Sequence, residues 1–335
     1  MKVLILGVNG FIGSTLTEKA LKDTDWQLYG MDLRCDWLKD FLSNPRLTFQ
    51  EGDITIHKEW IEYHIKKCDV ILPLVAIATP ATYVSDPLRV FDLDFAANLE
   101  VIKLAAKHKK RIIFPSTSEV YGMCQDSEFK EEESNLIVGP INKQRWIYSC
   151  CKQLLDRVIY AYGIRDSLSY TLFRPFNWIG PRLDSIDKQK KGGSRALSQF
   201  ISNILYDGEI KLVDGGKQER CFTYIDDGVC ALMKIIENKD DCAKSRIFNI
   251  GNPHERYSIA ELAEKLLEVA VTIPQLKDKA SRTKIISVPG NDYYGGSYQD
   301  TNHRVPSIEN AKKYLNWQPT TGLTEAIKRT LEFYF

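Results

Sequence analysis

Tyr148 and Lys152, four residues apart in the stretch Tyr-Ser-Cys-Cys-Lys, are the side chains of this sequence best suited to acid–base chemistry. Residues at this spacing lie one turn apart on the same face of a helix. An ammonium close to a phenol favours the phenolate and lowers the tyrosine pKa from about 10. Such a phenolate can take a proton from a sugar or alcohol hydroxyl while a hydride leaves the same carbon. The pair therefore predicts a base for hydride-transfer chemistry.

A second polar group follows the apolar residues 112–115, which are typical of a buried strand. Thr117, Ser118 and Glu119 come just after this strand, and ligands bind beyond the carboxyl ends of such strands. A hydroxyl there can hydrogen-bond a reacting sugar oxygen, although serine and threonine can also simply cap a helix. Because a Tyr-x-x-x-Lys spacing often arises by chance, the prediction of catalysis depends on this group and on a cofactor motif as well.

Three glycines in the pattern Gly-x-x-Gly-x-x-Gly follow the first predicted strand, residues 3–6, and open a predicted helix. Glycine lets the backbone turn tightly and approach a pyrophosphate, which then binds at the helix N-terminus. The context favours a dinucleotide-binding loop over a plain turn of small residues. The cofactor-binding residues expected in this loop are Gly7, Asn9, Gly10, Phe11, Ile12 and Gly13.

Asp32 ends the second predicted strand, 19 residues after Gly13. A carboxylate at this place can accept hydrogen bonds from the adenosine ribose hydroxyls, and it repels a 2′-phosphate. The prediction is therefore NAD and not NADP, although the nearby cation Arg34 argues slightly the other way. Asp53 and Ile54 are candidates for the adenine edge, but Asp53 is equally well explained as a turn-forming residue.

The first half of the chain predicts the scaffold that must position these residues. Apolar runs alternate there with helical patterns, and the runs are residues 3–6, 28–31, 70–75, 111–115 and 170–173. This succession predicts an α/β fold with a Rossmann-type doubly wound parallel sheet. We expect residues 1–176 to form an NAD-binding domain that carries Tyr148 and Lys152. Residues 177–335 are expected to form mainly a smaller α/β substrate lobe, with segments that return to the sheet.

Composition excludes several classes of function. The 45 lysines and arginines balance 44 acidic residues, and a net charge of +1 gives no electrostatic basis for binding nucleic acid or an anionic membrane. No apolar run approaches the roughly 20 residues of a membrane helix, and the first run is too short for a signal peptide. The eight cysteines form no Cys-x-x-Cys pair, so we expect reduced thiols, a cytoplasmic protein and no metal site.

Taken together, the glycine loop, the stretch Ser-Thr-Ser-Glu-Val-Tyr-Gly at residues 116–122 and the Tyr-x-x-x-Lys pair resemble the extended short-chain dehydrogenase/reductase family. Members of this family act on nucleotide sugars. The resemblance covers nearly the whole chain, and the further matching segments are residues 174–177, 180–182, 220–227 and 249–251.

One departure from the family pattern points to a subgroup. The usual His-x-Ala-Ala after the fourth strand is replaced by Pro-Leu-Val-Ala-Ile-Ala-Thr-Pro at residues 73–80. With residues 176–184 and 297–307, this segment resembles the dehydrogenase half of the bifunctional aminoarabinose (polymyxin-resistance) enzyme, an NAD-dependent UDP-glucuronic acid decarboxylase. The formyltransferase half is absent from this sequence, so we expect a stand-alone relative or an excised domain whose formyltransferase partner is a separate chain or has been removed.

The resemblance implies oxidation at the sugar C4, followed by loss of carbon dioxide. Tyr148 as phenolate would remove the C4 hydroxyl proton, NAD would take the C4 hydride, and Lys152 would hold the phenolate and the nicotinamide ribose. Thr117 and Ser118 would steady the reacting oxygen. The 4-ketone then lies β to the C5 carboxylate, so its oxygen can accept the electrons that remain when carbon dioxide leaves, and the enolate needs a proton at C5.

Glu119 and Arg304 are implied by the resemblance as the acid/base pair of the decarboxylation. Arginine stays protonated at ordinary pH, so Arg304 could equally orient the departing carboxylate through a bidentate contact. Glu119 could crowd that carboxylate and favour its loss, or relay the C5 proton. Without the resemblance, Arg304 would be interpreted as a solvated surface cation.

The resemblance further implies a site for the UDP-sugar. Read singly, its residues would be surface charges or half-buried aromatic side chains. The implied substrate-binding residues are Ala78, Tyr83, Thr117, Ser118, Arg145, Asn177, Arg182, Arg195, Lys211, Arg220 and Tyr298.

Three activities stay open at this point. The first releases UDP-4-keto-pentose and NADH from UDP-glucuronic acid, and the second re-reduces the ketone to UDP-xylose or an apiose-type product. The third is a catalytically silent NAD-sensing scaffold, against which the complete Tyr148, Lys152 and Thr117 set argues. A 4,6-dehydratase or a 4-epimerase fits the residues at 118 and 119 less well. By the resemblance we also expect a homodimer and a role in lipid A modification.

Overall fold

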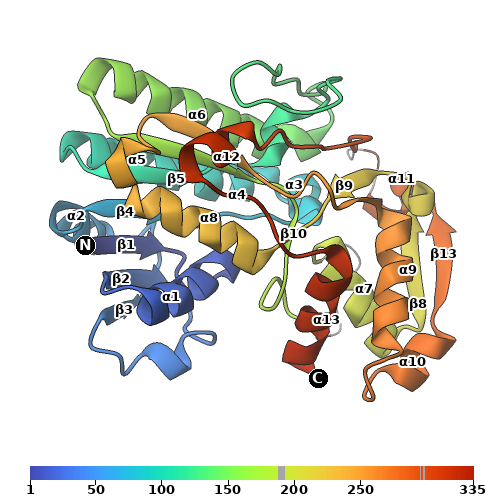
Figure 1. Ribbon diagram of the computed structural model, residues 1–335. Helices are drawn as coiled ribbons and strands as arrows, with labels where there is room; N and C mark the ends of the chain where they lie inside the picture. Colours follow the sequence, from blue (N-terminus) through green and yellow to red (C-terminus); the bar gives the residue numbers. More distant parts are fainter. Residues whose placement is uncertain (188–192, 295, 297–298) are drawn as a thin grey trace.

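The computed structural model describes residues 1–187, 193–294, 296 and 299–335. Its centre is a seven-stranded parallel sheet (Figure 1). The chain runs outward from β1 on one side and, after crossing back, outward from β4 on the other, so the predicted doubly wound topology is confirmed. In spatial order the strands are β11 (Arg246–Ile250), β6 (Tyr170–Pro175), β5 (Arg111–Pro115), β4 (Val70–Pro73), β1 (Lys2–Leu6), β2 (Gln27–Asp32) and β3 (Leu47–Glu51).

Helices cover both faces of this sheet because its strands are apolar on both sides. Val3 and Ile5 belong to the core shared with α1 (Phe11–Asp23) and α8 (Ile225–Glu237), whereas Leu4 and Leu6 belong to the core shared with α2 (Lys58–Lys67) and α5 (Asn98–Lys107). The long helix α6 (Ile147–Asp166) packs beside α5 on that second face. Continuous apolar strands of this kind are expected where a parallel sheet is buried on both faces.

A smaller lobe lies beyond one end of the sheet, to the right in Figure 1. Its short sheets pair β8 with β13, β9 with β12, and β7 with β10. The strands are β7 (Trp178–Ile179), β8 (Glu209–Val213), β9 (Glu219–Cys221), β10 (Thr223–Tyr224), β12 (Arg256–Ser258) and β13 (Lys284–Val288). The helices after β7, other than α8, are α7 (Ala196–Tyr206), α9 (Ile259–Ala270), α10 (Lys277–Arg282), α11 (Gly290–Tyr294), α12 (Glu309–Leu315) and α13 (Leu323–Tyr334).

Segments from the second half of the chain return to the large sheet. Strand β11 forms its outer edge beside β6, and α8 packs on the same face as α1. The expected division at residue 176 stays a prediction, because the two parts are joined by these returning segments. In the part of the chain that the structure describes, no helix is long and apolar enough to cross a membrane.

Three short helical segments connect β4 to α5. They are α3 (Pro80–Ser85), α4 (Pro87–Val90) and the π-helical segment Phe91–Ala97. Single π-helical turns inside helices occur frequently at functional sites. Helix α6 begins after a short 3₁₀ turn, Gln144–Trp146, so Arg145 precedes the helix that carries Tyr148 and Lys152.

Candidate active site

A cavity of about 710 Å³ lies between the carboxyl ends of the sheet strands and the smaller lobe. Its sheet side is built from the segments that follow β1, β4, β5 and β6, which meet at one edge because the strands are parallel. Lys211 and Arg220 of the smaller lobe line the opposite side. The sheet thus brings together segments that are more than 150 residues apart in sequence.

The glycine loop has the close approaches that a dinucleotide site requires. Gly7 has φ +87°, a conformation that side chains disfavour, and a Cβ on Gly13 would lie 2.4 Å from the Gly7 carbonyl oxygen. Helix α1 begins at Phe11 directly behind the loop, so its unpaired N–H groups are available to an anion. All six loop residues expected to bind the cofactor line the cavity, so the residues present fit a dinucleotide pyrophosphate.

Asp32 lies at the end of β2 beside this loop. Its Oδ2 accepts a hydrogen bond from the Asn9 backbone N–H at 2.9 Å, and burial raises the pKa of its carboxyl. With Trp37 it lines a second cavity of about 610 Å³ that adjoins the glycine loop. Asp53 and Ile54 are not among the residues that line either cavity. The Asp53 carboxylate accepts hydrogen bonds from Thr55, as in a turn, so its adenine contact stays a prediction.

Tyr148 and Lys152 lie one turn apart on α6, as expected, and both line the cavity. The expected effect on the tyrosine pKa was wrong for the side chains as they stand. Burial raises the pKa of Tyr148, and the negative charges of Asp94 and Glu119 raise it further. Lys152 donates a hydrogen bond to the Pro115 carbonyl oxygen at 3.0 Å, and its Nζ is 5.8 Å from the Tyr148 ring centroid. The spacing of four residues places Tyr148 and Lys152 on the same face of α6, but it does not bring the Lys152 ammonium into contact with the Tyr148 hydroxyl.

The surroundings of this pair form what we call the base pocket: Tyr83, Asp94, Tyr148 and Lys152. The ring of Tyr83 stacks on that of Tyr148, with 4.8 Å between centroids and 6° between planes. Burial lowers the pKa of Lys152, and Asp94 is the largest influence that opposes this. All four residues are buried.

Asp94 is a member of the base pocket that the sequence reasoning missed. It lies in the π-helical segment, is fully buried, and accepts a hydrogen bond from the Ile77 backbone N–H at 2.9 Å. Its Oδ1 has no hydrogen-bond partner among the described residues, and burial raises the pKa of its carboxyl to about 6. The stretch Phe-Asp-Leu-Asp-Phe at residues 91–95 holds two aspartates between apolar residues, and nothing in the sequence distinguishes the buried Asp94 from the exposed Asp92.

Thr117, Ser118 and Glu119 follow β5 and line the cavity. Thr117 also caps the short 3₁₀ turn Ser118–Tyr121, because its Oγ1 accepts a hydrogen bond from the Glu119 N–H at 3.2 Å. The capping role and the cavity position, which the sequence presented as alternatives, are therefore combined in one residue. The turn directs Glu119 toward two arginines.

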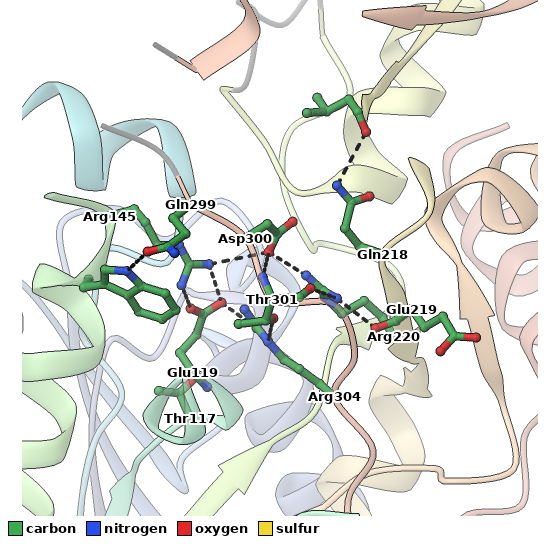
Figure 2. A network of polar contacts seen from close by, with 12 residues as sticks. Thr117, Glu119, Arg145, Gln218, Glu219, Arg220, Gln299, Asp300, Thr301 and Arg304 are labelled. Atoms are coloured by element: carbon green, nitrogen blue, oxygen red, sulfur yellow. Dashed lines mark hydrogen bonds and ion pairs between the residues drawn. The ribbon is translucent and has the colours of Figure 1, made fainter. Parts of the chain in front are cut away.

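These arginines belong to a cluster that we call the charged wall: Glu119, Arg145, Arg220, Asp300 and Arg304, all of which line the cavity (Figure 2). Glu119 Oε2 lies 2.6 Å from Arg145 Nη1, and its Oε1 lies 2.5 Å from Arg304 Nη1. Burial alone would raise the pKa of Glu119, but the two guanidiniums outweigh it and lower the pKa to about 2. Glu119 is therefore a carboxylate at neutral pH.

Asp300 extends the charged wall toward the smaller lobe, and sequence reasoning gave it no role. Its Oδ1 accepts a hydrogen bond from Arg220 Nη2 at 2.7 Å and lies 4.0 Å from Arg145 Nη2. The guanidinium of Arg304 is fixed in turn by Thr301, whose Oγ1 accepts from its Nε at 3.0 Å. Three guanidiniums face two carboxylates, which leaves the charged wall with a net charge of +1.

Ten of the eleven residues implied for substrate binding line the cavity. Of these, Arg182 pairs with Glu18 at 2.8 Å, and Arg195 pairs with Asp184 at 2.9 Å, so both are also held by protein carboxylates. Asn177 follows β6 with φ +41°, which places it at the strand end as expected. Tyr298 lies outside the described residues.

A model of the NAD dependent epimerase/dehydratase family matches residues 3–251. Among solved structures, the PbgP3 protein from Burkholderia pseudomallei is 55% identical, with a TM-score of 0.90, and the match covers 99% of this chain and 96% of that chain. UDP-glucuronic acid 4-epimerase from Bacillus cereus, in complex with UDP-glucuronic acid and NAD, is 21% identical, with a TM-score of 0.83 and coverage of 99% and 98%. A dTDP-glucose 4,6-dehydratase from Bacillus anthracis, in complex with NAD, is 20% identical, with a TM-score of 0.79 and coverage of 100% and 96%. The last two likenesses show the fold alone.

Proposed function

This chain belongs to the NAD-dependent epimerase/dehydratase family, a group of extended short-chain dehydrogenases/reductases, and from that premise we propose that it decarboxylates UDP-glucuronic acid oxidatively. The observation that carries this proposal is the charged wall. At one end of this wall the buried Arg304, held by Glu119 and Thr301, lines the same cavity as the predicted base, where a guanidinium can pair with a carboxylate carried by the sugar. A uronate has a carboxylate at that end of the molecule, whereas a neutral hexose does not.

NAD is the cofactor of the family, and the glycine loop and Asp32 would hold its pyrophosphate and adenosine ribose. When bound, NAD accepts the hydride from the sugar C4, and the positive charge of its nicotinamide ring would favour ionisation of a nearby phenol. The second effect matters here because burial and two carboxylates keep Tyr148 protonated in the protein alone.

Tyr148 is proposed to take the proton of the C4 hydroxyl as the C4 hydride leaves. Lys152 is held by the Pro115 carbonyl oxygen, behind the tyrosine on the same helix face, and it would contribute its positive charge to the phenolate from there. Thr117 and Ser118 would hydrogen-bond the reacting oxygen from the end of β5. The product of this step is the 4-ketone, which lies β to the C5 carboxylate.

The second step breaks the bond between C5 and the carboxyl carbon. The bonding electrons move into the ketone as an enolate, carbon dioxide leaves, and C5 then takes a proton. Glu119 is held as a carboxylate by two guanidiniums, which supports a role in fixing Arg145 and Arg304 and argues against Glu119 as the proton donor at neutral pH. Arg304 would orient the departing carboxylate until the bond breaks.

A homodimer is proposed as the assembled form. Helix α6 exposes Leu154, Tyr160 and Ile164, whose side chains are 49%, 54% and 71% accessible. Leu88 of α4, at 73%, is also exposed, on an element that packs near α6. Apolar side chains exposed on one helix are typical of a surface that a second subunit covers. A formyltransferase partner stays a prediction from the resemblance.

The test of the activity is one incubation of the protein with UDP-glucuronic acid and NAD. Carbon dioxide release with an equal rise in free NADH supports release of UDP-4-keto-pentose. Carbon dioxide release with no net NADH would replace that product by a re-reduced pentose. Turnover of UDP-glucose or UDP-galactose, with none of UDP-glucuronic acid, would contradict the proposed function. Absence of turnover with all three sugars would contradict it as well and would favour an NAD-sensing role.

A further inference from the structure

Asp300 joins two arginines that come from different parts of the fold. Arg145 precedes α6 on the sheet side of the cavity, whereas Arg220 lies in β9 of the smaller lobe. Figure 2 shows the Asp300 carboxylate between these two guanidiniums, and its Oδ1 is 2.7 Å from Arg220 Nη2 and 4.0 Å from Arg145 Nη2. Asp300 is therefore a direct link between the two sides of the cavity.

The charged wall is an alternating chain in which Arg304, Glu119, Arg145, Asp300 and Arg220 follow one another (Figure 2). Arginines occupy both ends, and Arg145 in the middle contacts both carboxylates. The Arg145 side chain is 1% exposed and that of Arg220 is 8% exposed. In such a buried setting, loss of Asp300 leaves three guanidiniums with one carboxylate, so the repulsion between Arg145 and Arg220 increases.

The two ends of this chain face different parts of the cavity. Glu119 follows Thr117 and Ser118 after β5, beside the base pocket, so Arg304 and Glu119 lie at the reacting end. Arg220 lies with Lys211 on the lobe side, where a nucleotide diphosphate would be held if the sugar C4 is to reach Tyr148. A UDP-hexuronate carries negative charge at both of these places.

We propose that Asp300 is a positioning residue that holds Arg220 toward the diphosphate and Arg145 toward Glu119, and so couples the nucleotide end of the site to the decarboxylating end. The proposal rests on the proposed function for the identity of the substrate. It goes further because it assigns to one carboxylate the alignment of two guanidiniums that would otherwise repel each other.

The first experiment measures the binding of UDP alone by calorimetry, without NAD and without turnover. Asp300→Asn keeps the shape and removes the charge, and we expect it to weaken UDP binding about tenfold. Glu219→Gln is the matched control, because Glu219 adjoins Arg220 in β9 but directs its carboxylate to the exposed Arg256. The control is expected to bind UDP within about twofold of wild type, and unchanged UDP binding by Asp300→Asn would overturn the proposal.

The second experiment is a double-mutant cycle on kcat for carbon dioxide release. Asp300→Asn and Glu119→Gln act on the same guanidinium, Arg145, so the double variant should lose clearly less activity than the product of the two single losses. Losses that multiply would show that the two carboxylates act independently and would overturn the coupling. If Asp300 only stabilised the fold of residues 299–304, its loss would not depend on the presence of Glu119, and the two losses would multiply.

Asp300→Glu keeps the experiment decisive if Asp300→Asn does not fold. It retains the charge but moves it by one methylene, so we expect UDP affinity within about threefold of wild type and kcat reduced about tenfold. An unchanged kcat would contradict the positioning role. If wild type releases no carbon dioxide from UDP-glucuronic acid, the proposed function fails, whereas the UDP-binding comparison still decides whether Asp300 positions Arg220.

Discussion

Tyr83, Tyr148 and Lys152 of the base pocket line the same cavity as the charged wall, but the ionisable groups of the two regions have opposite pKa shifts. In the base pocket, burial raises the pKa of Asp94 to about 6, raises that of Tyr148 and lowers that of Lys152, so each pKa shifts in the direction of the neutral form. In the charged wall, guanidiniums lower the pKa of Glu119 to about 2, although burial acts in the opposite direction. Depth in the protein therefore does not by itself decide the charge of a group.

The difference lies in the number and geometry of the counter-charges. Glu119 has a guanidinium on each carboxylate oxygen, and charge-assisted hydrogen bonds of this kind are among the strongest in proteins. Asp94 accepts one backbone hydrogen bond, and its Oδ1 has no partner among the residues that the structure describes. One region is thus suited to hold a fixed charge, whereas the other keeps Tyr148 protonated until a further positive charge is bound beside it.

The largest expected effect is on hydride transfer, through the base pocket. Tyr148→Phe removes the proton acceptor, so hydride transfer should fall by about a thousandfold or more, while NAD binding stays unchanged. The initial rate of NADH formation and calorimetric NAD binding measure the two quantities. Tyr160→Phe is the matched control on the exposed side of the same helix and should keep full activity. A Tyr148→Phe enzyme with substantial activity would show that another group is the base.

The next effect is on the charged wall. Glu119→Gln leaves Arg145 and Arg304 without their shared carboxylate, so carbon dioxide release should fall about a hundredfold, whereas UDP binding should change by less than about threefold. Glu133→Gln, an exposed glutamate that pairs with Lys130, is the control. Equal losses in decarboxylation and in UDP binding would argue against a role of Glu119 at the reacting end.

A smaller effect is expected on the pH dependence of kcat when a charge is removed from the base pocket. Asp94→Asn removes a negative charge that raises the pKa of Tyr148 and supports the charged form of Lys152. Both limbs of the pH profile of kcat should therefore move to lower pH, which increases activity several-fold on the acidic limb and changes the plateau little. Glu119, the Thr117 hydroxyl and Arg195 also act on Tyr148 and are unchanged in this variant. Asp92→Asn, exposed in the same π-helical segment, is the control.

The result that would contradict this account is a lower plateau with both limbs in place. Such a profile would indicate that Asp94 mainly supports the loop at Ile77, whose backbone N–H donates a hydrogen bond to the Asp94 carboxylate. The direction of the shift, more than its size, separates the two roles.

The smallest effect is on stability, and it has opposite signs in the two regions. Glu119 has a lowered pKa, so its contribution to the free energy of unfolding is present above about pH 4.5 and is lost as the pH falls toward 2. Asp94 has a raised pKa, so the free energy of unfolding falls as the pH rises from about 4 to 6. Each dependence should be worth about 1–3 kcal/mol.

Thermal unfolding of the two variants measures this difference. Relative to wild type, Glu119→Gln should lose a rise of Tm with pH between about pH 2 and 4.5, and Asp94→Asn should lose a fall of Tm with pH between about pH 4 and 6. Each change corresponds to a few degrees in Tm for a protein of this size. The same sign in both variants would mean that the charged wall and the base pocket do not differ as described.

The parts of the site that lie close together in sequence were predictable. The glycine loop, strand β1 and helix α1 form one continuous segment, and Gly7 and Gly13 make the close approaches that this motif implies. Tyr148 and Lys152 share a helix face because 3.6 residues make one turn. The parallel sheet followed from alternating strands and helices, since each crossover requires the strands to run the same way.

The sequence by itself therefore determined the fold class, the cofactor loop and the identity of the residues at the strand ends. Only the tertiary structure decided what those residues do electrostatically. It placed Lys152 on the Pro115 carbonyl, brought Asp94 beside the base, and set Asp300 between Arg145 and Arg220, which lie 155 and 80 residues before it in sequence. The physical reason is that backbone motifs depend on neighbouring residues, whereas pKa values depend on distances and solvent exclusion that exist only in the folded chain.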